Sequence, residues 1–205
     1  MFATGGLMSV DPKTLDVYNE MAADYAAVFD NTSKPDTDLA RFIKAMPKGG
    51  RVLDLGCGPG GASYLMAQAG LAVDALDASP EMVRLACEKG IKARVATFDD
   101  VQDVDTFDGV WANFSLLHAP REKLPLHFAA LAKALRAGGH MHVGLKTGSG
   151  IERDHLQRLY TFVEQDELAE LFAQAGLSVV ATRTGSGVGL AGTDDPWVIM
   201  LGRKS

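Results

Sequence analysis

Residues 52–61 read Val-Leu-Asp-Leu-Gly-Cys-Gly-Pro-Gly-Gly, and this stretch decides the fold. The Val- and Leu-rich run that ends at Leu55 is typical of a buried strand, and residues 62–69 have the composition of a helix. The glycines between them satisfy the spacing G-x-G-x-x-G at Gly56, Gly58 and Gly61. Such a loop leaves backbone amides free to meet a ligand where a helix begins, although the same spacing also serves a tight strand-to-helix turn.

Strand and helix patterns keep alternating along the chain. The expected strands are residues 51–55, 72–76, 93–98, 109–112 and 140–145. The expected helices are residues 62–69, 81–88, about 122–135, and 165–175. This alternation predicts an α/β fold with a parallel sheet that is covered by helices on both faces.

The two ends of the chain depart from this alternation. Residues 178–182 and 197–201 read as strands joined by a glycine-rich connection without a helix, so they are expected to pair antiparallel. Residues 15–29 form an amphipathic pattern, and a second helix is expected at 38–46. These helices before the first strand are either a lid or an extra core layer.

Length and composition limit the classes of protein. The chain has 205 residues, of which 47% are apolar, and we expect one domain over 1–205, with a helical cap at 1–48 and the core at 49–205. The net charge of -6, without any long run of Lys or Arg, predicts no nucleic-acid partner. Oligomeric state stays open.

Location follows from similar arguments. The sequence shows no secretory signal and no run of about 18 apolar residues, so no membrane partner is expected. The two cysteines, Cys57 and Cys87, are too few for a disulfide framework, which favours a cytoplasmic protein. We expect no metal site, because His127, His140 and His142 have no carboxylate at ligand spacing and read as structural.

Two carboxylates indicate the ligand. Asp77 ends the second expected strand 21 residues beyond Gly56, where a carboxylate accepts hydrogen bonds from ribose hydroxyls, so both NAD and S-adenosylmethionine fit. Asp54 lies inside the first strand, where a buried carboxylate is costly unless it meets a cation. The ammonium and sulfonium of S-adenosylmethionine suit Asp54, whereas it would repel the pyrophosphate of NAD.

At this point the chain resembles the class I S-adenosylmethionine-dependent methyltransferases. Four segments carry the resemblance in the family's order, namely Val52-Leu-Asp-Leu-Gly-Cys-Gly-Pro-Gly60, Leu76-Asp-Ala-Ser-Pro-Glu-Met82, Phe107-Asp-Gly-Val-Trp-Ala-Asn-Phe-Ser-Leu-Leu-His118 and Leu135-Arg-Ala-Gly-Gly139. Residues 116–121 resemble small bacterial members, including the tellurite-resistance type and those that act on quinone precursors. The resemblance implies a single Rossmann-like, doubly wound sheet of seven strands in the order 3-2-1-4-5-7-6, with strand 7 antiparallel.

The resemblance also implies a cofactor, S-adenosyl-L-methionine, and roles for particular residues. Asp54 and Gly56 would face its methionine part, Gly58 would allow close approach, and Asp77 would hold the ribose. The remaining candidates are Ala78, Met82, Phe98 and Asp99 around the adenine, Asn113 and Phe114 beside the methyl group, and Tyr18 and Tyr25 on a closing helix. Asp100 is the alternative to Asp99, and simple packing is the alternative for the two tyrosines.

The chemistry of methyl transfer indicates three catalytic candidates. An in-line displacement needs alignment and exclusion of water, and a base only when the nucleophile carries a proton. His118 follows the fourth strand and is a candidate base or orienting group. Arg158 and Tyr160 follow the fifth strand, where an arginine binds an oxyanion. The alternatives are a packing role for His118 and an exposed position for Arg158.

A small-molecule acceptor is expected, because Asn113-Phe-Ser-Leu lacks the consecutive prolines and aromatic residue that many base and glutamine methyltransferases carry. Two other functions are kept as alternatives. One is a catalytically silent S-adenosylmethionine-binding or scaffold protein. The other is an NAD-dependent oxidoreductase, which would need a hydride-site pair such as Tyr-x-x-x-Lys that we do not find.

Overall fold

One seven-stranded sheet organises the molecule, in a computed structural model that describes residues 10–205. The strands are β1 (Arg51–Leu55), β2 (Ala72–Asp77), β3 (Ala93–Val95), β4 (Phe107–Asn113), β5 (Leu135–Lys146), β8 (Leu177–Val188) and β9 (Asp194–Lys204). Their order is β3-β2-β1-β4-β5-β9-β8, and β9 runs antiparallel to both of its neighbours. The order expected from the sequence is confirmed, since β9 is the seventh strand of this sheet in chain order.

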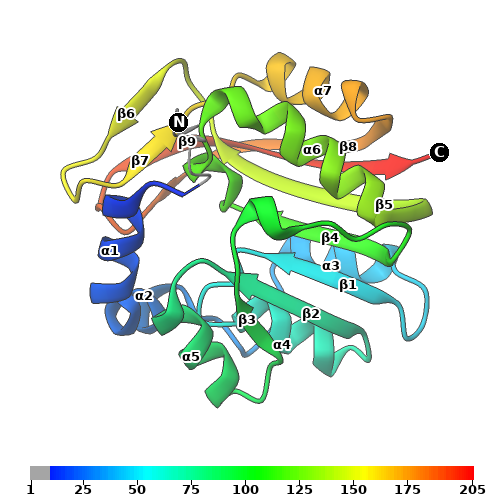
Figure 1. The fold of residues 1–205 in the computed structure, drawn as a ribbon, viewed down its shortest axis with the longest axis horizontal. Helices are drawn as coiled ribbons and strands as arrows, with labels where there is room; N and C mark the ends of the chain where they lie inside the picture. Colours follow the sequence, from blue (N-terminus) through cyan, green and yellow to red (C-terminus); the bar gives the residue numbers. More distant parts are fainter. Residues whose placement is uncertain (1–9) are drawn as a thin grey trace, which may run out of the picture.

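Helices cover both faces of the sheet (Figure 1). They are α1 (Pro12–Glu20), α2 (Ala22–Phe29), α3 (Thr37–Ala45), α4 (Gly61–Gln68), α5 (Pro80–Glu88), α6 (Leu124–Ala134) and α7 (Gln165–Gln174), with short 3-10 turns η1 (Phe98–Asp100), η2 (Leu116–His118) and η3 (Arg121–Lys123). None of the helices described for residues 10–205 is long and apolar enough to cross a bilayer.

The side chains of β1 alternate between the two layers, as a buried strand requires. Leu53 and Leu55 pack in the larger core cluster, which includes residues of α6 and α7. Val52 packs on the other face, against Phe42 of α3 and Met66 of α4. Phe42 is fully buried, so α3 is an added core layer.

The helix expected over 15–29 is interrupted, and that expectation is wrong in detail. Met21, with φ -102° and ψ 16°, separates α1 from α2. The first helix also begins earlier than expected, because the Asp11 side chain caps it by accepting the Thr14 amide at 2.9 Å and Pro12 suits the first turn. Both helices lie at the edge of the sheet to which the carboxyl ends of the parallel strands point (Figure 1). The first nine residues of the expected cap lie outside the described part.

The expected bounds of further elements are wrong, and one hairpin was not predicted. The sixth helix ends at Ala134 and β5 begins at Leu135, which pairs with Phe107 before a register shift in β4. The third strand ends at Val95, because the chain turns into η1, where Thr97 and Asp100 form a capping box. A separate antiparallel hairpin of β6 (Ile151–Arg153) and β7 (Leu159–Thr161) follows β5, and its three-residue strands carry too little alternation to be recognised.

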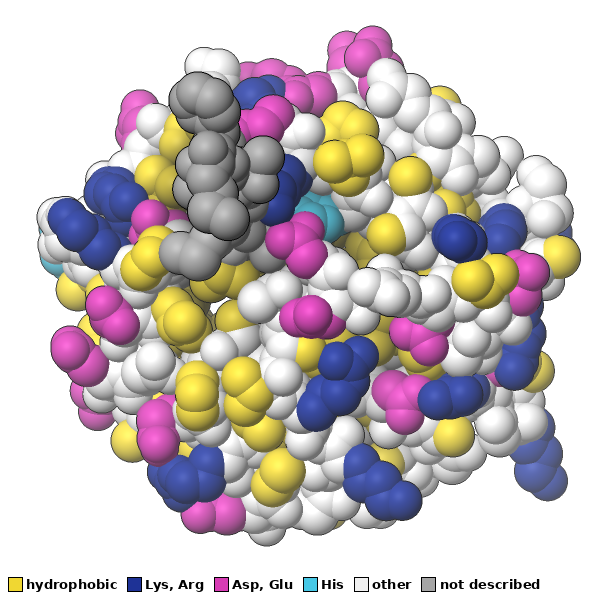
Figure 2. Space-filling view, in the orientation of Figure 1, with side chains coloured by type: hydrophobic (Ala, Val, Ile, Leu, Met, Phe, Trp, Pro, Cys, Tyr) yellow, Lys and Arg dark blue, Asp and Glu magenta, His cyan; other side chains and the backbone are white. Residues whose placement is uncertain are grey.

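Charges are mixed over the surface. On the face drawn in Figure 2, basic and acidic side chains are interspersed around small apolar areas. Many belong to ion pairs, such as Arg51 with Asp74 and Arg136 with Asp108.

The position of α3 in the core leads to a test of stability. We expect Phe42→Ala to lower the free energy of unfolding by about 3 to 5 kcal/mol, the usual range for a buried aromatic side chain. Leu126→Ala on α6 is the control, since Leu126 is 68% exposed and its loss should cost no more than about 0.5 kcal/mol. Urea denaturation measures both, and equal effects would contradict the packing of α3.

Candidate active site

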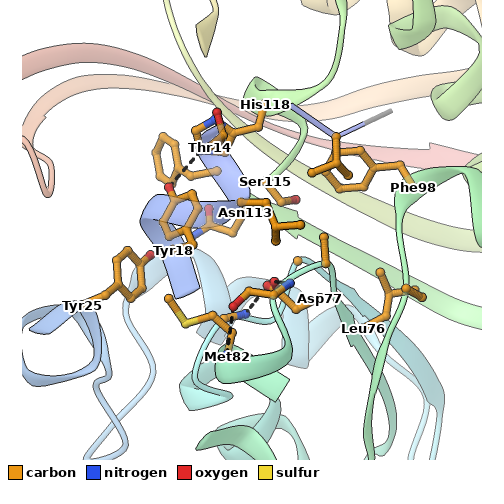
Figure 3. A pocket seen from close by; sticks show the side chains of 18 residues that line it. Thr14, Tyr18, Tyr25, Leu76, Asp77, Met82, Phe98, Asn113, Ser115 and His118 are labelled. Carbon is orange, nitrogen blue, oxygen red and sulfur yellow. Dashed lines mark hydrogen bonds between the residues drawn. The ribbon is translucent and has the colours of Figure 1, made fainter. Parts of the chain in front are cut away.

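A cavity, here called the first cavity, opens at the carboxyl ends of β1, β2 and β4, the edge where open α/β sheets bind ligands. Figure 3 shows Tyr18 and Tyr25 on one side of it, Leu76 and Phe98 on the opposite side, and Asp77 between them. Eleven of the candidates line it, namely Tyr18, Tyr25, Gly56, Gly58, Asp77, Ala78, Met82, Phe98, Asn113, Phe114 and His118.

The glycine loop is held against the end of β2. The amides of Gly56 and Cys57 both donate to the Leu76 carbonyl oxygen, at 2.8 and 2.9 Å. Gly56 has φ +74°, and a Cβ atom placed on it would lie 2.4 Å from the Cβ of Ser115. Only glycine fits there, so the loop passes close under the cavity with its backbone accessible.

Asp77 is the acid of this cavity. Its Oδ2 accepts the Gly58 amide at 2.9 Å and its Oδ1 accepts the Ser79 amide at 2.8 Å. Burial raises the pKa of Asp77, and these backbone hydrogen bonds oppose the rise. Each carboxylate oxygen keeps a further lone pair for a ligand.

Ser79, the N-cap of α5, also joins two helices. Its hydroxyl oxygen accepts the Met82 amide at 3.2 Å and its proton is donated to Oδ1 of Asn19 at 2.6 Å. The first helix is thereby attached to α5 at the rim of the first cavity.

Asp54 lies on the other side of the glycine loop. It lines a neighbouring cavity, here called the third cavity. The residues Gly56, Gly58, Tyr25 and Asn113 line both this cavity and the first. Its Oδ2 accepts the hydroxyl of Ser63 at 2.6 Å. Burial raises the pKa of Asp54 to about 7. The donors to this buried carboxyl are the hydroxyl and the backbone amide of Ser63, and its role in holding a cation stays a prediction.

Tyr18 and His118 form a hydrogen-bonded pair at the wall of the first cavity. His118 Nδ1 lies 2.7 Å from the Leu159 carbonyl oxygen, which can only accept, so Nδ1 carries the proton. Its Nε2, 2.9 Å from the Tyr18 hydroxyl, therefore accepts from Tyr18. Burial lowers the pKa of His118 to about 4, so the ring is neutral, whereas burial raises the pKa of Tyr18 and keeps its hydroxyl protonated.

Arg158 and Tyr160 line a second cavity, which shares Tyr18, Tyr25, Asn113 and Phe114 with the first. The alternative of an exposed Arg158 is wrong, since its side chain is 2% exposed. Its Nε and Nη2 donate to Asp154 Oδ2 at 2.9 and 2.7 Å, and Nη1 donates to the Tyr18 hydroxyl at 3.1 Å.

Sequence reasoning missed Lys146 and Trp197, which line the same second cavity. Lys146 ends β5, and its Nζ lies 2.5 Å from Asp195 Oδ2 and 4.1 Å from the centre of the Tyr160 ring. The signal for Lys146 was its place at the carboxyl end of a parallel strand. Trp197 offered no such signal.

Asn113 touches all three cavities. Its Oδ1 accepts from His142 Nε2 at 3.0 Å, and His142 stacks on Trp111 with ring centres 3.7 Å apart. The hydrogen bond from His142 and the stacking of His142 on Trp111 fix the orientation of the Asn113 side-chain amide. Phe114 follows with φ +54°, and its amide donates to the Gly144 carbonyl oxygen.

Asp99 does not line any of the three cavities. Its carboxylate pairs with Lys123 at 3.0 Å, and the alternative, Asp100, accepts the Thr97 amide in the capping box. The preceding Phe98 is the residue of this turn that lines the first cavity.

Part of the sequence is similar to known methyltransferases. A family model described as a methyltransferase domain matches residues 52–139. Trans-aconitate 2-methyltransferase of Mycolicibacterium gilvum is 36% identical over 117 residues, which are 56% of this chain and 44% of that protein. The ubiquinone biosynthesis O-methyltransferase of Xanthomonas axonopodis pv. citri is 36% identical over 103 residues, 46% of this chain and 42% of that protein. The matched region thus covers less than half the length of each of these two relatives.

The fold is shared with solved methyltransferases. The 1,6-didemethyltoxoflavin-N1-methyltransferase of Burkholderia thailandensis, solved with its acceptor and S-adenosylhomocysteine, superposes with a TM-score of 0.75 at 24% identity, covering 94% of this chain and 88% of that one. Phosphoethanolamine N-methyltransferase 2 of Haemonchus contortus gives a TM-score of 0.73 at 16% identity, covering 99% of this chain and 61% of that one. Residues 52–139 thus match a methyltransferase-domain family, and the chain has the fold of the class I S-adenosylmethionine-dependent methyltransferases.

Proposed function

We propose that the protein transfers a methyl group from S-adenosyl-L-methionine to a small-molecule acceptor. The observation that carries this proposal is the junction of two cavities at Tyr18, Tyr25, Asn113 and Phe114. A cofactor in the first cavity and an acceptor in the second would meet at this junction.

The residues present fit the cofactor. Asp77 would accept from the ribose hydroxyls, and Ala78, Met82 and Phe98 offer apolar surface to the adenine. Asp54 in the adjoining third cavity suits the ammonium group. Ser115 Oγ lines the first cavity, is buried and has no hydrogen-bond partner among residues 10–205, so a polar ligand atom would satisfy it.

When bound, S-adenosyl-L-methionine would supply an activated methyl group on its sulfonium sulfur, and the acceptor would supply the electron pair for the new bond. The protein's part is to align the acceptor and exclude water. Tyr18 and Phe114 line both cavities and serve this purpose at their junction.

Tyr18 is the polar group at this junction. Its hydroxyl donates to His118 and accepts from Arg158, which leaves one lone pair for the acceptor. A neutral acceptor group would pass its proton to Tyr18 Oη as the tyrosine proton moves to His118 Nε2. An acceptor that arrives as an anion needs no base, and the low pKa of His118 favours that case.

The two alternative functions predict different experimental outcomes. Binding of NAD is opposed by Asp54, which lines the third cavity beside the glycine loop and would repel the pyrophosphate. A silent binding protein would hold the cofactor but methylate nothing. Relatives named for trans-aconitate, ubiquinone biosynthesis and 1,6-didemethyltoxoflavin favour an enzyme with a small acceptor, without agreeing on one molecule.

Calorimetry separates the cofactors. We expect S-adenosylmethionine and S-adenosylhomocysteine to bind at micromolar concentration and NAD not to bind. Binding of NAD alone would refute the proposal.

The role of Asp77 can be tested on affinity. Asp77→Asn keeps the size of the side chain and removes the charge that would hold the ribose hydroxyls. Loss of one such charge-assisted bond, worth about 1.5 to 3 kcal/mol, should weaken S-adenosylmethionine binding roughly 10- to 150-fold. Asp74→Asn on the same strand is the matched control, because Asp74 pairs with Arg51 at the surface. If Asp74→Asn impairs binding equally, the assignment of the ribose to Asp77 fails.

The role of Tyr18 can be tested on turnover. Tyr18→Phe keeps the ring and removes the hydroxyl between His118 and Arg158. With an acceptor that carries a proton we expect kcat to fall roughly 100-fold or more, while the dissociation constant for S-adenosylhomocysteine stays within about threefold. Tyr64→Phe on α4 removes a hydroxyl elsewhere and should change neither quantity. Unchanged kcat in Tyr18→Phe would place the acceptor's polar contact on another residue.

The raised pKa of Asp54 predicts a pH-dependent cost in stability. In the unfolded chain this carboxyl ionises near 3.8, but in the folded protein only near 7. Stability should therefore fall as the pH rises from about 4 to about 7, by up to about 4 kcal/mol at 1.36 kcal/mol per pKa unit. Asp54→Asn removes this cost, so urea denaturation without ligand should show the variant's gain over wild type to be larger near pH 8 than near pH 4. An equal difference at both pH values would contradict the buried, shifted carboxyl.

A further inference from the structure

The second cavity is small and its walls are aromatic. Its volume is about 340 Å³, at the lower end of the range for small-ligand sites. Six aromatic side chains line it, namely Tyr18, Tyr25, Phe29, Phe114, Tyr160 and Trp197. Flat rings on several sides suit a planar guest that stacks against them.

The protein's own cations already contact these rings. Lys146 Nζ lies 4.1 Å from the centre of the Tyr160 ring, and the Arg158 guanidinium carbon lies 5.2 Å from the same centre. Arg158 also lies 5.5 Å from the centre of Tyr18. Aromatic faces attract cations, but here a cationic guest would meet two fixed positive charges.

The charges of the described residues that line the second cavity do not sum to zero. Lys146 and Arg158 are positive, and Asp195 is the one negative side chain among the described lining residues. Asp154, the carboxylate that pairs with Arg158, is not among them. The described lining residues therefore carry a net charge of one positive unit.

We infer that the acceptor is a planar aromatic or heteroaromatic molecule with one anionic group, and that this cavity discriminates against amines. The inference rests on the proposed methyl transfer, since it names the acceptor for that same site. A neutral His118, with both ring nitrogens already engaged, agrees with an acceptor that is ionised before it reacts.

The first experiment measures binding without turnover, in the presence of saturating S-adenosylhomocysteine. Two series of probes keep the ring and change the charge: 4-hydroxybenzoate, 4-hydroxybenzyl alcohol and tyramine, and then quinoline-2-carboxylate, quinoline and 4-(aminomethyl)quinoline. Trans-aconitate serves as the anion without a ring. The chain has two tryptophans, and Trp197 lines the cavity, so the probes should change its fluorescence, and Trp197→Phe should abolish that change.

We expect the aromatic anion of at least one series to bind tenfold or more tightly than its amine and than trans-aconitate. Amines that bind as tightly as the anions, or trans-aconitate as the one ligand that binds, would overturn the inference. So would failure of all six aromatic probes in protein that binds S-adenosylhomocysteine by calorimetry. If S-adenosylhomocysteine itself does not bind, the proposed function fails first, and the two failures are thereby distinguished.

A charge variant tests the electrostatic part. Lys146→Met removes one cation from the lining and should lower the preference for anion over amine about tenfold, with S-adenosylhomocysteine affinity within threefold of wild type. Lys204→Met is the control, because Lys204 is also a paired lysine, bound to Asp105. Lys146→Gln replaces Lys146→Met if the latter loses affinity for S-adenosylhomocysteine. The role of Lys146 would be contradicted if Lys146→Met kept the wild-type preference for anion over amine, or if Lys204→Met changed that preference equally.

Discussion

The hydrogen bonds that Asp77 and its neighbour Leu76 accept hold the whole site together. The carbonyl of Leu76 accepts two amides of the glycine loop, and the Asp77 carboxylate accepts one amide from that loop and one from Ser79. The ends of β1 and β2 and the start of α5 are thereby fixed relative to one another. Since partial burial raises the pKa of Asp77, hydroxyl donors from a ligand would stabilise the charged form further.

The first helix is attached to this frame from two directions. Asn19 binds Ser79 on α5, while Thr14 Oγ1 accepts the Leu159 amide at 2.8 Å from the β6–β7 hairpin. Arg153 of the same hairpin pairs with Asp11 at 2.7 Å. Tyr18 is thus held at the place where the walls of the first and second cavities meet.

The parts of the fold that the sequence predicted well are those that local pattern determines. The first strand, the glycine loop and the position of Asp77 depend on neighbours within a few residues. The Tyr18–His118 contact joins residues 100 positions apart, and the Lys146–Asp195 pair joins residues 49 apart, so no local pattern shows them. Burial of Arg158 depends on the hairpin, whose strands are too short to show alternation, although Asp154 four residues earlier was a visible partner.

The glycine loop and the second cavity are built from different parts of the chain. Residues 52–139, which match the methyltransferase-domain model, contribute the glycine loop and Asp77, whereas most of the second cavity comes from segments on either side of that range. Under the proposed function, substitutions at Lys146, Tyr160 or Trp197 would therefore change the acceptor and leave the glycine loop and Asp77 intact. Such a chain would be able to exchange one substrate for another in evolution without rebuilding the cavity that contains Asp77.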